Sequence, residues 1–249
     1  MRLGIAIGVL LLCCTTFGLG QEADIAKREA QIVHLRAAYL SVAFDYSRRS
    51  DSLARCFQDS LLALLQNPAS QRYAFPLLRE KVGIQLSEDR LLRVVSFNYR
   101  LGGSNHETVA FAQYAFEDGI QILPLLDDSD DLEGGFTDSG YGKIYQFTTD
   151  SSRYYLLLGG GTHGAGHHHK IIRLFCHTEA GLAEVAKAFG KDRYLAVEAP
   201  RATDIALTFD PETRHIVQPA FRFDPDQGFF FPTDEIRIWH WTGAGFQTE

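Results

Sequence analysis

Histidine is the residue type whose number and spacing in this chain could support chemistry. Residues 159–170 read GGGTHGAGHHHK and bring His163, His167 and His169 into one short segment. In an extended strand, side chains two residues apart point to the same face, so His167 and His169 can hold one ion while His168 points to the other face. Neutral imidazole is a common ligand of zinc and other transition metals. His163, His167 and His169 are therefore the candidate metal ligands, and a metal-dependent or other hydrolase built on them is one functional hypothesis.

The same segment contains the GxGxxG spacing of dinucleotide-binding proteins. That kind of site needs a helix directly after the third glycine, whereas HHHKIIRLF continues as an alternating strand. The glycines therefore predict a hairpin loop. The sequence also lacks HExxH, GxSxG and SxxK motifs. We expect the protein to work without a cofactor, with zinc or another transition metal as the alternative.

Aromatic side chains supply the other candidate surface. Phe229, Phe230 and Phe231 follow Gly228 and precede Pro232, so three rings lie beside a turn. Such rings can fill a core, or they can form a platform for a glycan, a peptide or a partner protein. Because no catalytic motif is found, the main functional hypothesis is a non-enzymatic binding or structural module that engages a polymer or a protein through loops of a β-domain.

The charge balance excludes one class of partner. The chain of 249 residues has 24 Lys and Arg against 31 Asp and Glu, a formal net charge of -7. Nucleic-acid binding depends on clustered positive charge, because the phosphate backbone supplies most of the affinity. No nucleic-acid partner is expected.

The first residues predict export. Residues 1–20 contain a single charge at Arg2, an apolar run over 3–14 and small residues at 18–20, which is the pattern of a cleaved signal peptide. The apolar run is shorter than the roughly 20 residues that span a membrane, so no transmembrane span is expected after cleavage. The expected location is the periplasm or the extracellular space, with a lipid anchor at the envelope, through Cys13 or Cys14, as the alternative.

Two cysteines remain after the predicted cleavage, Cys56 and Cys176. In an oxidising compartment they can form one disulfide, and they are the candidate pair for it. Cys56 lies on the apolar stripe of a predicted helix and Cys176 on the apolar face of a predicted strand, so both are expected to be buried, and two inert core thiols are an equal alternative. The chain has no CxxC motif, which excludes the common zinc-ribbon and thioredoxin-type sites.

These candidate residues lie on a chain whose hydrophobic period changes once. Residues 21–85 show helical spacing, with helices expected over 22–48, over 51–66 with Asp51 as the cap, and around 77–81. Residues 86–249 alternate with period two and predict an antiparallel β domain, packed as one unit with the helices. Residues 182–199 fit either a short helix or two strands. The predicted strands are 91–99, 107–116, 120–126, 141–149, 153–158, 168–177, 205–210, 215–217, 221–223 and 235–241.

The predicted fold class is mainly β with an N-terminal helical region. A β-sandwich or a barrel-like sheet is expected because short strands with almost no intervening helix leave little room for parallel crossovers. A β-propeller-like arrangement is the alternative, although no repeat of fixed period is found.

Several stretches of the β region carry a resemblance. They are SEDRLLRVVSFNYRLGGSNHETVAFAQY, YYLLLGGGTH, HHHKIIRLF, LTFDPETRHIVQPAF and IRIWHWTGAGF. Together they resemble a family of small secreted bacterial proteins of uncharacterised function over about residues 85–249. The resemblance implies an exported, β-rich fold and supplies no catalytic residues. The first stretch and the closing Trp-x-Trp-x-Gly are also similar to single blades of β-propellers.

Overall fold

The computed structural model describes residues 4–43, 48–102, 105–117, 119–125, 139–149, 152–163, 166–226 and 228–248. Within these ranges, side chains are described except at 4–19, 48, 99–102, 105–107, 163 and 229. The chain divides into two compact units, Met1–Val82 and Gly83–Glu249. The division lies three residues before the predicted boundary between helical and β regions. That the two units pack as one stays a prediction.

The first unit is helical. It contains α1 (Gly4–Leu40), α2 (Arg48–Leu65) and the 3-10 helices η2 (Pro68–Arg72) and η3 (Leu78–Glu80). Glu29 of α1 is fully buried, and its carboxylate accepts hydrogen bonds from the Tyr73 hydroxyl and from the backbone N–H groups of Leu77 and Leu78. These bonds attach the segment after α2 to α1. Among the described residues, no helix is both long and apolar enough to cross a membrane.

The second helix corrects two sequence expectations. Asp51 does not cap it, because α2 already begins at Arg48 and Asp51 lies in its first turn. The prediction that Cys56 is buried was also wrong, since the residue is exposed. The buried stripe of α2 passes through Phe57 instead, and Cys56 lies outside it. The other buried hydrophobic residues of this stripe are Ala54, Leu61, Leu64 and Leu65.

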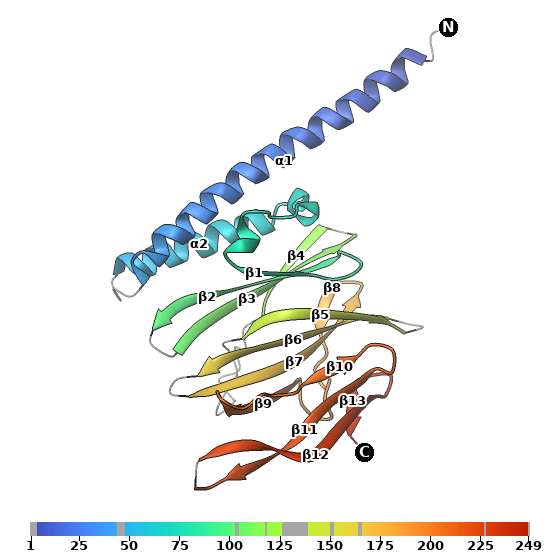
Figure 1. Cartoon of the computed structure of the whole chain (residues 1–249). Helices are drawn as coiled ribbons and strands as arrows, with labels where there is room; N and C mark the ends of the chain where they lie inside the picture. The colour runs from blue at the N-terminus through green and yellow to red at the C-terminus, as the bar shows by residue number, and fades with distance from the viewer. Residues whose placement is uncertain are drawn as a thin grey trace. The chain divides into compact units, whose positions relative to one another are not determined.

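The second unit consists of three antiparallel sheets (Figure 1). The first sheet contains β1 (Gly83–Leu86), β2 (Leu92–Gly102), β3 (Asn105–Phe116) and β4 (Gly119–Pro124). The middle sheet contains β5 (Gly140–Thr148), β6 (Arg153–His163), β7 (His167–Thr178), β8 (Gly181–Glu184) and β9 (Tyr194–Pro200). The third sheet contains β10 (Thr208–Asp210), β11 (His215–Asp224), β12 (Phe229–Trp241) and β13 (Phe246–Thr248).

The strands within each sheet mostly follow chain order, as in a meander, and β8 and β9 both pair with β7. The segment 182–199 thus contributes to two strands and to no helix. The fold is mainly β and consistent with a β-sandwich, as predicted, and none of the described sheets closes into a barrel.

The middle sheet is buried on both faces, because its strands carry apolar residues at consecutive positions. In β6, Tyr154 and Leu156 belong to one core while Tyr155 and Leu157 belong to the other. Such a continuous apolar run is typical of a strand covered on both sides. The core with the first sheet includes Leu92, Val94, Ala112, Tyr114, Ile171 and Phe175. The core with the third sheet includes Ile172, Leu174, Phe209, Ile216 and Phe246, with Trp239 and Trp241 packed against it.

Candidate functional site

The glycine-rich segment forms a hairpin, but Gly159, Gly160 and Gly161 lie within strand β6 and not in the predicted loop. Strands β6 and β7 pair continuously from Tyr154 opposite Cys176 to His163 opposite His167. The glycines serve close backbone packing: a Cβ added at Gly160 would lie 2.3 Å from the carbonyl oxygen of His169. No residue larger than glycine fits there without a backbone shift, which gives the segment a structural explanation that involves no nucleotide.

The histidines of this hairpin each have a separate neighbour. His167 Nδ1 lies 2.5 Å from Oε1 of Glu198, His168 Nε2 lies 2.7 Å from the carbonyl oxygen of Thr203, and His169 Nε2 lies 2.7 Å from the hydroxyl of Ser139. His169 is buried. In the described part of the chain, no group of three His, Cys, Asp or Glu residues could hold a metal ion. The side chain of His163 lies outside the described residues, so the site of His163, His167 and His169 stays a prediction.

The two cysteines of the predicted disulfide pair lie on different elements of the fold. Cys56 is exposed on α2 and Cys176 is half-buried on β7, and within the described residues neither forms a disulfide. Burial raises the pKa of the Cys176 thiol. Since the thiolate is the nucleophilic form, this shift keeps Cys176 in its unreactive form at neutral pH.

The predicted aromatic surface lies on a two-stranded arm of the third sheet. β10 pairs with β11 only at residues 215–217. β13 pairs with β12 only at residues 239–241, the C-terminal end of β12. Beyond these positions β11 and β12 pair with each other and with no further described strand. We call this part, residues 219–238, the arm.

Two phenylalanine rings lie exposed at the end of the arm. Phe223 of β11 and Phe230 of β12 are directly opposite in register, are 49% and 48% exposed, and have ring centroids 5.2 Å apart. Beside them is an open hollow of about 360 Å³ lined in part by Phe223, Phe231 and Pro232. Phe230 is therefore exposed, and Phe231 is half-buried. The side chain of Phe229 lies outside the described residues.

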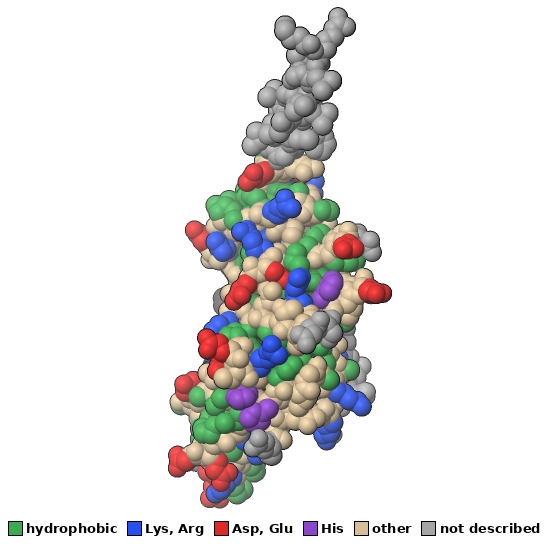
Figure 2. Space-filling model, turned by 90° about the vertical axis from the view of Figure 1, so that its right-hand side faces the viewer, with side chains coloured by type: hydrophobic (Ala, Val, Ile, Leu, Met, Phe, Trp, Pro, Cys, Tyr) green, Lys and Arg blue, Asp and Glu red, His purple; other side chains and the backbone are tan. Residues whose placement is uncertain are grey.

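The arm is acidic. It contains the four acidic residues Asp224, Asp226, Asp234 and Glu235 against only two arginines. Figure 2 shows red acidic side chains together with blue basic and green hydrophobic ones at the end of the second unit where the arm lies. Phe223 was not singled out from the sequence, because only the β11–β12 register shows that it forms a pair with Phe230.

The third sheet also holds a histidine pair that sequence reasoning missed. His215 of β11 lies opposite His240 of β12, and Nδ1 of His240 is 3.0 Å from Nε2 of His215. The two residues are 25 positions apart in the chain and belong to no motif. The only sequence signal for this pair is the alternation of apolar residues in each strand, which puts both histidines on the face away from the core.

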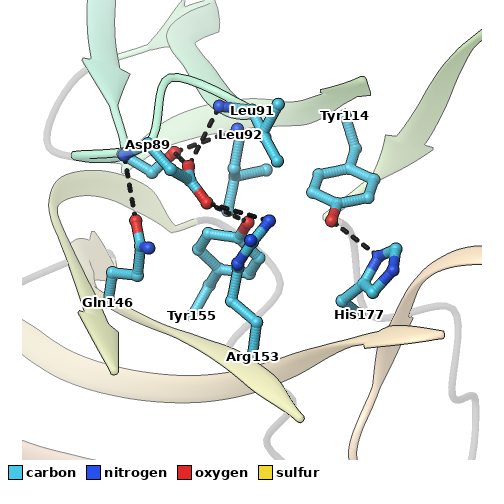
Figure 3. Close-up of polar contacts among 9 residues, drawn as sticks. Asp89, Leu91, Leu92, Tyr114, Gln146, Arg153, Tyr155 and His177 are labelled. Carbon is cyan, nitrogen blue, oxygen red and sulfur yellow. Dashed lines mark hydrogen bonds and ion pairs between the residues drawn. The ribbon is translucent and has the colours of Figure 1, made fainter. Parts of the chain in front are cut away.

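A polar cluster joins the first sheet to the middle sheet around Asp89 (Figure 3). Oδ1 of Asp89 accepts hydrogen bonds from the Ser87 hydroxyl at 2.6 Å and the Leu91 N–H at 3.0 Å. Oδ2 accepts one from the Tyr155 hydroxyl at 2.7 Å and lies 3.3 Å from Nη1 of Arg153. Both carboxylate oxygens are therefore engaged by donors.

The protonation states in this cluster favour anchoring over catalysis. Burial and the bond to Asp89 raise the pKa of Tyr155, so the phenol remains a donor. Burial acts to lower the pKa of Arg153, but the contacts with Tyr155 and Asp89 outweigh it and raise the pKa. A carboxylate held by an arginine, a phenol and a backbone N–H is poorly placed to take a proton from a substrate.

One exposed group borders this cluster. His177 is exposed, and its Nδ1 lies 2.8 Å from the hydroxyl of the buried Tyr114 (Figure 3). This contact orients the ring with Nε2 away from Tyr114. None of the side chains drawn in Figure 3 is an activated nucleophile.

Comparison with known proteins adds no relative to this geometry: no family model, no curated protein and no solved structure matches the chain.

Proposed function

We propose that the chain is an exported, non-enzymatic binding module and that the arm of the third sheet is its contact surface. The observation that carries the proposal is the pair of half-exposed rings, Phe223 and Phe230, at the end of two strands that extend past their neighbours in the sheet. Exposed aromatic rings in a cluster are typical anchors of a binding surface, because they bury a large apolar area with little loss of side-chain entropy.

The proposed partner is an extended, positively charged segment of another protein. β11 and β12 present backbone edges along the arm, and an extended peptide can pair with such an edge. Side chains of that peptide at alternate positions could contact Phe223 and Phe230, while its basic residues would face the excess of acidic residues in the arm. Electrostatic complementarity of this kind raises the association rate and selects against acidic partners.

The experiment is a selection of displayed random peptides on the purified chain. We expect the enriched peptides to alternate apolar and basic residues. Their affinity should fall about tenfold or more in a Phe223→Ala, Phe230→Ala double variant, since loss of aromatic anchors typically costs about 2 kcal/mol or more. Binding should also weaken with added salt, because the attraction to the acidic residues is screened.

Leu86→Ala is the matched control. Leu86 is an exposed hydrophobic residue on β1, 38% exposed, and lies outside the arm. Peptides that bind the double variant as tightly as the original chain, or that lose affinity equally in Leu86→Ala, would refute the arm as the contact surface. Binding of soluble glycans in place of any peptide would refute the proposed partner.

A further inference from the structure

A second kind of site lies on the same sheet, away from the aromatic end of the arm. His215 and His240 face each other across β11 and β12, with ring centroids 4.4 Å apart and ring planes at 80°. Their facing nitrogens, Nε2 of His215 and Nδ1 of His240, are 3.0 Å apart. Two imidazoles thus converge at one point from neighbouring strands.

The pair contributes little to the core. Trp239 and Trp241, on either side of His240, pack against the core between the middle and third sheets. Side chains alternate along a strand, so His240 points to the opposite, outer face. His215 is on the outer face for the same reason, because its neighbour Ile216 is fully buried. Both histidines are partly exposed, which leaves room for an ion and its water ligands.

The separation of the two nitrogens suits one metal ion. Zinc and similar ions bind imidazole nitrogen at about 2.0–2.1 Å, so two nitrogens on the same ion lie about 3 Å apart for angles near 90° and somewhat further for tetrahedral angles. In the structure the two nitrogens form a hydrogen bond, in which a proton lies between them. A metal ion bound to both nitrogens would take the place of that proton.

The charges around the pair also suit a cation. Asp210 of β10 lies opposite His215 in register, so a carboxylate occupies the next position in the row. Arg214, which precedes His215, directs its guanidinium to the carbonyl oxygen of Thr148 and to the ring of Phe147. Gln247, opposite His240 on the other side, is neutral. Across this row the histidines therefore have the Asp210 carboxylate on one side and a neutral amide on the other, and Arg237 lines the same hollow as His240.

We propose that His215 and His240 form a two-histidine site for a divalent transition metal of the zinc, copper and nickel class. Imidazole suits these ions, whereas calcium and magnesium prefer oxygen ligands. The remaining coordination positions are open to water or to a ligand from another molecule. The site is distinct from the histidines of the β6–β7 hairpin and is independent of the proposed peptide-binding function.

The test is equilibrium dialysis of the full chain against Zn²⁺ alone, with the bound metal counted per chain. We expect His215→Ala, His240→Ala and the double variant each to bind one ion fewer than the original chain. The two single changes should not add, because one imidazole alone no longer chelates.

Controls separate this site from the other histidines. His34→Ala removes an exposed histidine of α1, and His167→Ala removes one from the β6–β7 hairpin; neither should change the ion assigned to His215 and His240. Far-ultraviolet circular dichroism should show that the variants stay folded, since both histidines lie on a solvent face. Equal zinc binding by the double variant and the original chain, no binding by the original chain, or loss of the same ion in His167→Ala would each overturn the proposal.

Discussion

The hydroxyl of Tyr155 donates a 2.7 Å hydrogen bond to Oδ2 of Asp89, across 66 positions of the chain. Tyr155 is fully buried in the middle sheet, and Asp89 lies in the turn that leads into β2 of the first sheet. A second bond, from the Asp89 N–H to Oε1 of Gln146, connects the same turn to β5. The turn is therefore fixed to the middle sheet by polar contacts in addition to the apolar core between the two sheets.

Tyr155→Phe should lower the free energy of unfolding by about 1–3 kcal/mol. The substitution keeps the ring in the core but removes one donor from a largely buried carboxylate, and a hydrogen bond to a charged group contributes about that much. Urea unfolding followed by fluorescence measures the difference.

Tyr145→Phe is the matched control for this change. Tyr145 is half-buried, and within the described part of the chain its hydroxyl makes no hydrogen bond. A change within about 0.5 kcal/mol is expected for it. If the two variants lost equal stability, the bond between Tyr155 and Asp89 would not be the cause.

The same bond predicts a loss of stability in alkali. Burial and the contact with Asp89 raise the pKa of Tyr155 above the value of about 10 that a tyrosine has in an unfolded chain. A raised pKa in the folded state stabilises the protein fully below pH 10, and the contribution disappears as the pH rises beyond it. The stability difference between the original chain and Tyr155→Phe should be constant from about pH 7 to 9.5 and should shrink above pH 10. A difference that stayed constant to pH 11.5 would contradict the shift.

Tyr73 should show a related effect in the helical unit. Burial, followed by the hydrogen bond to Glu29, raises the pKa of Tyr73 to about 12. Absorbance titration of tyrosinate should therefore contain a late component near pH 12 that Tyr73→Phe removes. Loss of a component near pH 10 instead would show that the contact between Tyr73 and Glu29 does not persist in solution.

How much of this fold can be predicted from sequence depends on how far apart in the chain the interacting residues are. The alternation in β2 and β3 is local, so these strands were predicted within three residues of their observed bounds, whereas the strand predicted over 153–158 ends five residues before β6 does. The four-residue strand β1 and the three-residue strand β13 are too short to show a period, and both were missed. The consecutive apolar residues of β6 carried the information that the middle sheet is covered on both faces, but which sheets cover it depends on contacts between distant segments.

The candidate sites show the same division. The position of Phe230 beside a turn was predicted because turn composition is local, whereas its exposure was left open between a core and a surface. Its partner Phe223, like the pair of His215 and His240, depends on the register of β11 and β12, and a bulge after Pro219 shifts that register. A shift by one residue would move every side chain of the strand to the other face, so no count of residues from one motif to the next could have predicted these pairs.

Gly160→Ala should destabilise the β6–β7 hairpin. The added Cβ would lie 2.3 Å from the backbone oxygen of His169, and a backbone atom cannot move aside as a flexible side chain can. Overpacking of this kind typically costs about 1–3 kcal/mol. Gly142→Ala on the adjacent β5 is the control, because no atom lies within 4 Å of its added Cβ. Thermal unfolding of the two variants should differ clearly, and equal melting temperatures would show that β6 adjusts to the extra methyl group.

Glu184→Gln should be the most destabilising of these changes. Arg173 has a side chain only 6% exposed and donates to both carboxylate oxygens of Glu184, at 2.6 Å from Nε and 2.7 Å from Nη2. Burial would lower the pKa of Arg173, but the hydrogen bonds to Glu184 outweigh it and raise the pKa. The guanidinium also stays charged in Glu184→Gln, because arginine is protonated at any ordinary pH. Removing the partner of a buried charge typically costs about 3–5 kcal/mol.

The neighbouring Arg193 provides the comparison for Glu184→Gln. Its side chain is 38% exposed and its Nε lies 3.5 Å from the same carboxylate, so Arg193→Gln should cost at most about 1 kcal/mol. Added salt should reduce the small effect of Arg193→Gln much more than the large effect of Glu184→Gln, because screening acts on exposed pairs. Urea unfolding at low and high salt measures both. A Glu184→Gln variant as stable as Arg193→Gln would mean that water or another acceptor replaces the carboxylate, and that Arg173 is less buried in solution than in this structure.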